Sequence, residues 1–361
     1  MAGQGSLVVV GTPIGNLADL SPRAAEALRG ADVVACEDTR RTAPLLRHAG
    51  ADAPMVAVHQ HNEAARAADL VARMRAGARV ALVSDAGMPL VSDPGARLVR
   101  AALDAELPVE VVPGPSAVTA ALAGQPRRGQ GGGHRAGTGD DLDRQLGVER
   151  GARVALVSDA GMPLVSDPGA RLVRAALDAE LPVEVVPGPS AVTAALAASG
   201  LAGEVGFVFL GFAPRRAAER RRLVERLAGL EVPAVAFESP RRLPGLLAEI
   251  AAALPDRPVA VCRELTKLHE EVVRGTAAEV ARRLAEPPRG EVTVVVGAAP
   301  AAATPDEARL QEVLAVLREA GLGPARAAEV AAALGAAPRN RAYREALAGR
   351  DGAEGGPDEP H

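Results

Sequence analysis

The chain contains almost no lysine, cysteine or aromatic residues. Lys267 is the only lysine among 41 basic residues, and the aromatics are four Phe and one Tyr, with no Trp. Base stacking on aromatic platforms is therefore nearly excluded as a mode of nucleic-acid binding. Cys36 and Cys262 are too few for a disulfide framework or a four-cysteine metal site, which indicates a reducing compartment.

Other absences exclude further classes of protein. The net charge is −4, so any contact with nucleic acid requires a local basic patch. The chain has no Gly-Lys-Ser/Thr phosphate loop and no strand–GxGxxG–helix unit, and its six histidines show no HExxH or zinc spacing. It also lacks a signal-peptide pattern and any apolar run of ~18 residues. We expect a soluble, cytoplasmic protein without a metal.

An identical internal repeat is present. Residues 77–123 recur without substitution at 151–197, an offset of 74 (151 − 77), and removal of one period leaves 361 − 74 = 287 residues. Solenoid repeats diverge and come in longer series, so two identical copies indicate a recent duplication or an assembly error. The Gly- and Arg-rich stretch between the copies, 124–150, is predicted to be a disordered linker.

Strand-like and helix-like segments alternate along most of the chain. Short apolar runs such as SLVVV and VVAC are separated by amphipathic segments, which is typical of an α/β protein with a mainly parallel sheet. We predict an N-terminal α/β domain over 1–202, a second, mixed-sheet α/β domain over 203–300, a small helical domain over 304–350 and a disordered tail over 351–361.

Glycine–proline loops follow several predicted strands. Ligands of open α/β sheets bind at the carboxyl ends of strands, where such loops lie, although an ordinary tight turn is the alternative for each loop alone. The loops are GTPIGN (11–16), SDAGMP (84–89 and 158–163) and PGPS (113–116 and 187–190). The candidate cofactor-binding residues are Gly11, Pro13, Gly15, Asn16, Asp85, Gly87, Asp159, Gly161, Pro163, Pro187, Gly188 and Ser190.

Charged clusters mark the candidate acceptor site. ACEDTRR (35–41) and HQHNE (59–63) follow neighbouring strands, and Asp38, His61 and Glu63 are candidates for acid–base work, with a solvated loop as the alternative. Arginines gather in 214–222 and 239–242; a solvated helix face is the usual explanation of such a run, but in an acidic protein it is the best candidate for phosphate contacts. The candidate RNA-binding residues are Arg40, Arg41, Arg215, Arg216, Arg241 and Arg242.

Eight motifs together resemble those of a known family. They are GTPIGNLADLSPRA, CEDTRRT, HQHNE, VSDAGMPLVSDPG, VPGPSAVTAALAASGL, FLGFAPR, FESPRRL and CRELTKLHEE, and they extend from about Leu7 to Gly297. On them the chain is identified as a member of the tetrapyrrole methylase superfamily, the class III S-adenosylmethionine methyltransferases. Within it, the chain resembles the group that methylates small-subunit ribosomal RNA. The duplicated period is the one clear departure.

The resemblance implies a homodimer that binds S-adenosyl-L-methionine between two α/β domains. It also implies 2′-O-methylation of a decoding-centre cytidine in 16S rRNA, with the small ribosomal subunit as partner. It adds Glu238 and Ser239 to the cofactor candidates and Glu264 and Lys267 to the catalytic ones. Lysine is a compact point charge, unlike the planar guanidinium of arginine, so Lys267 is expected near the reacting ribose or its phosphate. Two alternatives stay open: methylation of a small tetrapyrrole or a protein, and a chain inactivated by the duplication.

Only one copy of the repeat can occupy the sheet, because the neighbouring strands occur once. We expect the second copy to do so, since its last helix continues without interruption as AVTAALAASG. The first copy would then be mobile or packed at the edge of the sheet.

Overall fold

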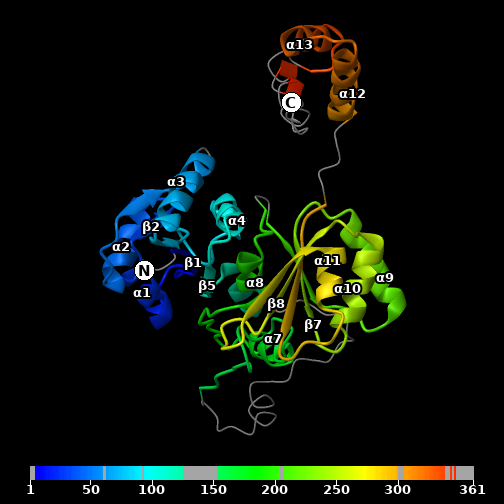
Figure 1. Ribbon diagram of the computed structural model, residues 1–361. Coiled ribbons are helices and arrows are strands. Elements are labelled where there is room, and N and C mark those ends of the chain that lie inside the picture. The colour runs from blue at the N-terminus through cyan, green and yellow to red at the C-terminus, as the bar shows by residue number, and fades with distance from the viewer. Residues whose placement is uncertain are drawn as a thin grey trace. The chain divides into compact units, whose positions relative to one another are not determined.

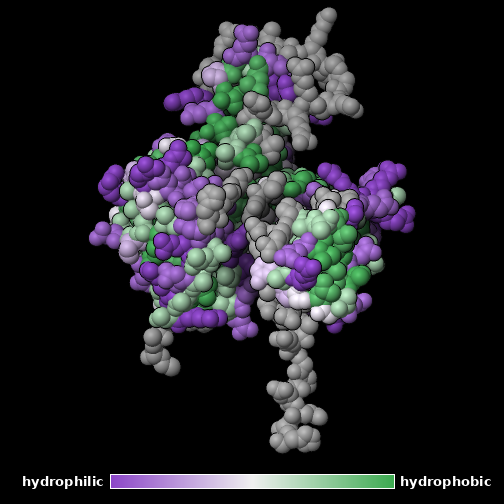
Figure 2. Space-filling view, turned by 90° about the horizontal axis from the view of Figure 1, so that it is seen from above, coloured by the Kyte–Doolittle hydropathy of each residue, from purple (hydrophilic) through white to green (hydrophobic). Residues whose placement is uncertain are grey.

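The computed structural model of the protein describes residues 5–59, 62–91, 93–124, 153–203, 206–299, 305–337, 342–343 and 345–346. Contacts divide the chain into two units, Met1–Ala299 and Pro300–His361. No helix in these described ranges is both long and apolar enough to cross a membrane. The face drawn in Figure 2 shows hydrophilic and hydrophobic residues intermixed. The division at 202/203 and the disorder of 351–361 stay predictions, and the linker 124–150 lies almost entirely outside the described residues.

The N-terminal sheet is parallel, and its strand order is β3-β2-β4-β1-β5. Its strands β1, β2 and β5 are labelled in Figure 1. The strands are β1 (Ser6–Val10), β2 (Val33–Cys36), β3 (Met55–Ala57), β4 (Arg79–Leu82) and β5 (Val109–Val112). The helices of this region are η1 (Leu17–Asp19), α1 (Pro22–Arg29), α2 (Thr39–Ala49), α3 (Glu63–Arg75), α4 (Ala96–Asp104) and α5 (Ala117–Gly124).

Both faces of this sheet are buried, which explains the continuous apolar runs. Leu7 and Val9 of β1 point into one core with residues of α3 and α4, and Val8 and Val10 point into another with residues of α1 and α2. The alternation follows the two-residue period of a strand. Ser21 accepts from the amide of Ala24 as the N-cap of α1, as its position before Pro22 predicts.

The second sheet is mixed, with the strand order β6-β7-β10-β8-β9. Its strands are β6 (Val208–Phe212), β7 (Ala234–Glu238), β8 (Pro258–Arg263), β9 (Glu271–Thr276) and β10 (Val292–Val296). Only the β6–β7 pair is parallel; the others are antiparallel. Helices α9 (Ala217–Ala228), α10 (Leu243–Ala253) and α11 (Ala277–Arg283) share one apolar core with this sheet.

The helix α8 (Ala191–Ser199) connects the two sheets. Residues 192–199 are all buried, and α8 contacts β5 of the first sheet and β7, β8, β9 and β10 of the second. At its C-terminal end, Arg274 of β9 donates to the carbonyl of Ala198 and Arg100 of α4 donates to that of Gly200. Two cations therefore meet the negative end of the helix dipole. The C-terminal unit contains α12 (Pro305–Glu319) and α13 (Pro324–Ala333) around its own small core.

The first copy of the repeat, not the second, supplies the strands. β4 and β5 lie within 77–123, and β1 pairs with both. Val83 and Val112 are each 2% exposed, whereas their counterparts Val157 and Val186 are 81% and 73% exposed. The prediction that the second copy occupies the sheet is therefore wrong for the strands. It is confirmed for the helix, since α8 belongs to the second copy and packs on the second sheet.

Local structure is nevertheless the same in both copies. Helix α7 (Ala170–Asp178) reproduces α4 residue for residue, and Leu90 and Leu164 share the left-handed conformation, with φ of 75° and 71°. Helices and turns form from local hydrogen bonds, but a strand needs a neighbouring strand. The segments that flank each copy therefore determine which copy forms strands. Helix α3, which directly precedes the first copy, packs along α4 of that copy.

Candidate cofactor and acceptor site

The loop that follows β1 and the two first-copy loops that follow β4 and β5 interlock at the carboxyl ends of these strands. The Thr12 amide and hydroxyl both donate to the carbonyl of Gly87, at 2.9 and 3.2 Å, and the hydroxyl of Ser84 donates to the same carbonyl at 3.2 Å. A Cβ on Gly11 would lie 2.4 Å from the amide nitrogen of Gly114. The predicted loops GTPIGN, SDAGMP and PGPS thus form one compact rim.

The glycines of this rim have different functions. Gly11 and Gly114 allow two backbones to pack against each other, so they serve loop packing and not the direct approach of a ligand. Gly87 has φ of +83°, a conformation that favours glycine, whereas a Cβ on Gly15 would meet nothing within 4 Å. Asn16 caps the short helix η1 by accepting from the amide of Ala18. Of these loop residues, Gly15 has the open surroundings that a ligand needs.

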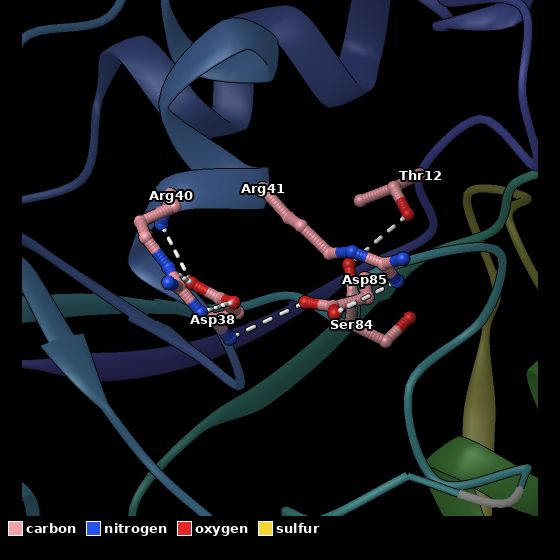
Figure 3. Close-up of polar contacts among 6 residues, drawn as sticks. All are labelled: Thr12, Asp38, Arg40, Arg41, Ser84 and Asp85. Carbon is pink, nitrogen blue, oxygen red and sulfur yellow. Dashed lines mark hydrogen bonds and ion pairs between the residues drawn. The ribbon is translucent and has the colours of Figure 1, made fainter.

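Asp85 connects this rim to the start of α2. One carboxylate oxygen accepts from the amide of Asp38 at 3.3 Å, and the other pairs with Arg41 at 3.2 Å (Figure 3). Asp38 caps α2 and pairs with Arg40 at 2.8 Å; these hydrogen bonds lower the pKa of Asp38 to about 2. Asp38 is therefore a fixed carboxylate and a weak base. Arg41 faces an aspartate, and its expected contact with RNA stays a prediction.

Within the described residues, no hydrogen bond links the corresponding loops of the second copy to β1, although Met162 shares an apolar core with Leu7 and Val9. They keep a contact of their own, between the amide of Gly188 and the sulfur of Met162 at 3.1 Å. Asp159 is exposed, and Ser190 caps α8 through the amide of Val192. Gly161, Pro163 and Pro187 lie in the same loops. The structure thus does not bring the second-copy candidates together with GTPIGN.

Glu63 has a structural role that the sequence does not indicate. It is 5% exposed, and one carboxylate oxygen accepts from the amides of Gly95 and Arg97, at 2.9 and 2.8 Å. Gly95 is the N-cap of α4 and has no side chain to cap that helix, so Glu63 supplies the missing acceptor. We therefore remove Glu63 from the candidate bases. His61 lies outside the described residues.

Lys267 lies in a tight loop between β8 and β9. Its ammonium pairs with Glu264 and Glu291, each at 3.0 Å, and it is 48% exposed. Both carboxylates raise the pKa of Lys267, while the amide of Glu291 and the ammonium lower the pKa of Glu264. Glu264 and Thr266 have φ of 50° and 68°, a strained conformation for residues other than glycine. These polar contacts are within the loop and to Glu291, so the structure does not join Lys267 to the rim.

The buried Glu238 pairs with the partly exposed Arg242 at the end of β7. Arg242 pairs with one oxygen of Glu238 at 2.5 Å and donates to the hydroxyl of Ser239 at 3.0 Å. The same oxygen of Glu238 accepts from the amide of Ser239, and the other oxygen is buried without a partner in the described residues. Arg242 therefore turns its guanidinium towards Glu238 and Ser239, and its expected contact with RNA stays a prediction. Arg215, Arg216 and Arg241 are exposed, as a phosphate contact requires.

Sequence reasoning missed three residues of the rim. Thr12 and Ser84 are buried hydroxyls that hold the loops together, and Asp93 is a half-buried carboxyl beside them. Burial, with the charges of Glu37 and Asp85, raises the pKa of Asp93, so it accepts a proton more readily than an ordinary aspartate. The signal was present in the repeated SD pair of VSDAGMPLVSDPG, of which only the first aspartate was chosen. Within the described part of the chain, no group of three or more His, Cys, Asp or Glu residues is placed to hold a metal ion.

Comparison with known proteins decides the family. The model of the Tetrapyrrole (Corrin/Porphyrin) Methylases matches residues 6–143 and 140–281, so each match contains one copy of the repeat. A ribosomal RNA small subunit methyltransferase I of Mycobacterium tuberculosis (strain H37Rv) is 38% identical over 361 residues, covering 99% of each chain. The chain belongs to this methyltransferase family. A relative of the same name from Micromonospora olivasterospora is 34% identical, covering 95% of this chain and 87% of its own.

Solved structures with a similar fold are more distant. The uroporphyrin III C-methyl transferase of Thermus thermophilus is 17% identical, covers 81% of this chain and 97% of its own, and has a TM-score of 0.30. A diphthine synthase is 13% identical, covers 81% of this chain and 90% of its own, and has a TM-score of 0.28. At these scores the superpositions add nothing to the family assignment.

Proposed function

We propose that this chain transfers a methyl group from S-adenosyl-L-methionine to the ribose 2′-hydroxyl of a decoding-centre cytidine in 16S rRNA. The observation that carries the proposal is the 38% identity, over 99% of both chains, to a ribosomal RNA small subunit methyltransferase I. The interlocked rim of β1, β4 and β5 supports it, because parallel sheets bind ligands at this end. As a homodimer on the small ribosomal subunit, the chain would act on assembled subunits.

The rim offers groups that suit the cofactor. The cofactor has ribose hydroxyls and amines, which are hydrogen-bond donors. Asp85 is a carboxylate acceptor that the amide of Asp38 and the side chain of Arg41 hold in place. Gly15 leaves open space in the loop after β1, and Asn16 fixes the end of that loop. When bound, the cofactor supplies an electrophilic methyl group on a sulfonium. We assign cofactor binding to the first-copy loops, with Asp85 and Gly87 in place of Asp159 and Gly161.

Lys267 would act as a cation and not as a base. Because Glu264 and Glu291 raise its pKa, the ammonium stays protonated at neutral pH. A fixed positive charge would lower the pKa of a neighbouring ribose 2′-hydroxyl, because it stabilises the alkoxide that remains when the proton passes to solvent; the negative charge on that oxygen is then consumed as the methyl group is transferred. Glu264, with its lowered pKa, positions that charge through the pair at 3.0 Å.

Methyl transfer to small subunits tests this function. Subunits that lack the modification are incubated with the chain and labelled S-adenosyl-L-methionine, and nucleosides of the 16S rRNA are analysed by mass spectrometry. We expect 2′-O-methylcytidine. Label in a tetrapyrrole or protein acceptor, with none in the subunits, would replace this function by the alternative. Cofactor binding without any transfer would indicate that the duplication inactivates the chain.

A further inference from the structure

All four phenylalanines of the chain lie on, or directly before, one pair of adjacent strands. Phe207 immediately precedes β6, Phe209 and Phe212 belong to β6, and Phe237 belongs to β7. Phe207, Phe209 and Phe237 are partly buried against the core, but Phe212 is 56% exposed. In a chain with so few aromatic residues, this clustering leaves one accessible phenylalanine ring at the end of a strand.

A bulge in β6 places that ring. Residues three apart on a regular strand point to opposite faces, yet Phe209 and Phe212 both contact Phe237, with ring centroids 5.1 and 5.5 Å away. The register shifts between Phe209 and Phe212, where Gly211 has φ of +69°. This extra residue brings Phe212 edge-on to Phe237, with an interplanar angle of 61°, and so fixes its orientation.

Two Pro-Arg-Arg turns leave the same end of the sheet. APRR (213–216) follows β6 and SPRR (239–242) follows β7, and these strands are parallel neighbours in which Phe212 pairs with Phe237. Arg242 turns inward to Glu238 and also donates to the carbonyl of Ala213, which connects the two turns.

The outward arginines stand on a rigid support. The side chain of Arg220 donates to the carbonyl of Arg215 at 2.8 Å and is itself fixed to Glu249 at 2.6 Å. Arg215, Arg216 and Arg241 are exposed, and in the described part of the chain Arg216 has a long pair, 3.5 Å, with Glu219. Three exposed arginines therefore lie on the two turns that follow Phe212 and its neighbour Phe237.

We propose that Phe212 and the two Pro-Arg-Arg turns form a nucleotide-binding subsite, in which an unpaired base stacks on Phe212 and arginines contact its flanking phosphates. Single-stranded RNA is recognised by this combination of aromatic face and positive charge. The subsite revises the expectation that aromatic stacking is excluded: one oriented ring serves one base. It deepens the proposed function by naming a second point at which the RNA acceptor is held.

Binding of short oligomers tests the subsite. The probes are a pentamer of cytidylate and a pentamer of abasic ribose phosphate with the same charge, measured by calorimetry or anisotropy with full-length chain. The wild type should bind the cytidylate more tightly than the abasic oligomer. Phe212→Leu, which keeps an apolar side chain without a π face, should weaken cytidylate binding by about tenfold, in the range found for one stacked base. Phe212→Trp is the matched control and should retain the preference.

The arginines have their own signature. Arg241→Gln should weaken both oligomers equally and lower the slope of log K against log salt by about 0.7 for one lost phosphate contact, whereas Phe212→Leu should leave the slope unchanged. An unchanged base preference in Phe212→Leu, or no binding of either oligomer, overturns the subsite. Methyl transfer to small subunits is measured separately, so active variants without a base preference would refute the subsite and leave the proposed function standing.

Discussion

The repeat provides a matched pair of positions with the same local sequence and opposite burial. Val83 is 2% exposed beside β4, and its counterpart Val157 is 81% exposed. Val83→Ala removes two methyl groups from the core. At about 0.8 kcal/mol for each, plus a cavity contribution, it should lower the free energy of unfolding by about 2–3 kcal/mol. Val157→Ala should change it by less than about 0.5 kcal/mol.

Urea unfolding followed by far-ultraviolet circular dichroism measures these differences, since the chain has no Trp for fluorescence. Amide hydrogen exchange in β4 measures the corresponding change in the free energy of local opening of that strand. If the second copy can replace the first in the sheet, the stability lost in Val83→Ala is limited. It cannot exceed the difference in free energy between the fold with first-copy strands and the fold with second-copy strands. The double variant would then lose more stability than the two single variants combined. Equal losses from both single variants would refute the assignment of β4 to the first copy.

Four substitutions and one titration test the site and its supports. Asp85→Ala should weaken binding of S-adenosyl-L-methionine in calorimetry while Asp159→Ala leaves it unchanged; the reverse would return the cofactor site to the second copy. Glu63→Ala removes the cap of α4 and should lower the free energy of unfolding by about 1–2 kcal/mol, whereas an unaffected melting curve would contradict that role. Lys267→Arg keeps the charge but changes its shape, so methyl transfer should fall at least about tenfold, equal to about 1.4 kcal/mol of barrier, with little change in cofactor affinity. The lowered pKa of Asp38, about 2, means that its stabilising effect is full above the unfolded pKa and is lost as the pH falls towards 2; a carboxyl resonance that titrates near the ordinary value would disprove this.

Much of the fold is predictable because it depends on local periodicity. The apolar runs and their flanking turns place β1, β2 and β4 correctly, and the Ser21–Pro22 pair marks the start of α1. Strand β9 was missed because Arg274 and Gly275 interrupt its apolar pattern. Its place is decided by antiparallel pairing with β8, which no single segment reveals.

The site was predictable at the level of its loops and not of its contacts. GTPIGN and the first-copy SDAGMP and PGPS loops do meet, as the strand-end argument requires. Glu63 has a partner that its local motif does not suggest, the N-terminus of a helix 32 residues away. Arg242 pairs with Glu238 of its own FESPRRL motif, but the burial of that carboxylate is not visible in the motif. Burial and partner, which set such roles, are tertiary properties.

The division of labour between the copies has an evolutionary consequence. The first copy contributes β4, α4 and β5, and the second contributes α8. Purifying selection for the fold therefore acts on the early part of one copy and the late part of the other, while substitutions in the remaining parts are less constrained. At present, excision of either period gives the same 287-residue protein, because 361 − 74 = 287 and the copies are identical. A deletion of residues 117–190, also 74 residues (190 − 117 + 1), would join β5 of the first copy directly to α8 of the second, so the duplication can be reversed without loss of any of these elements even after the two copies have drifted.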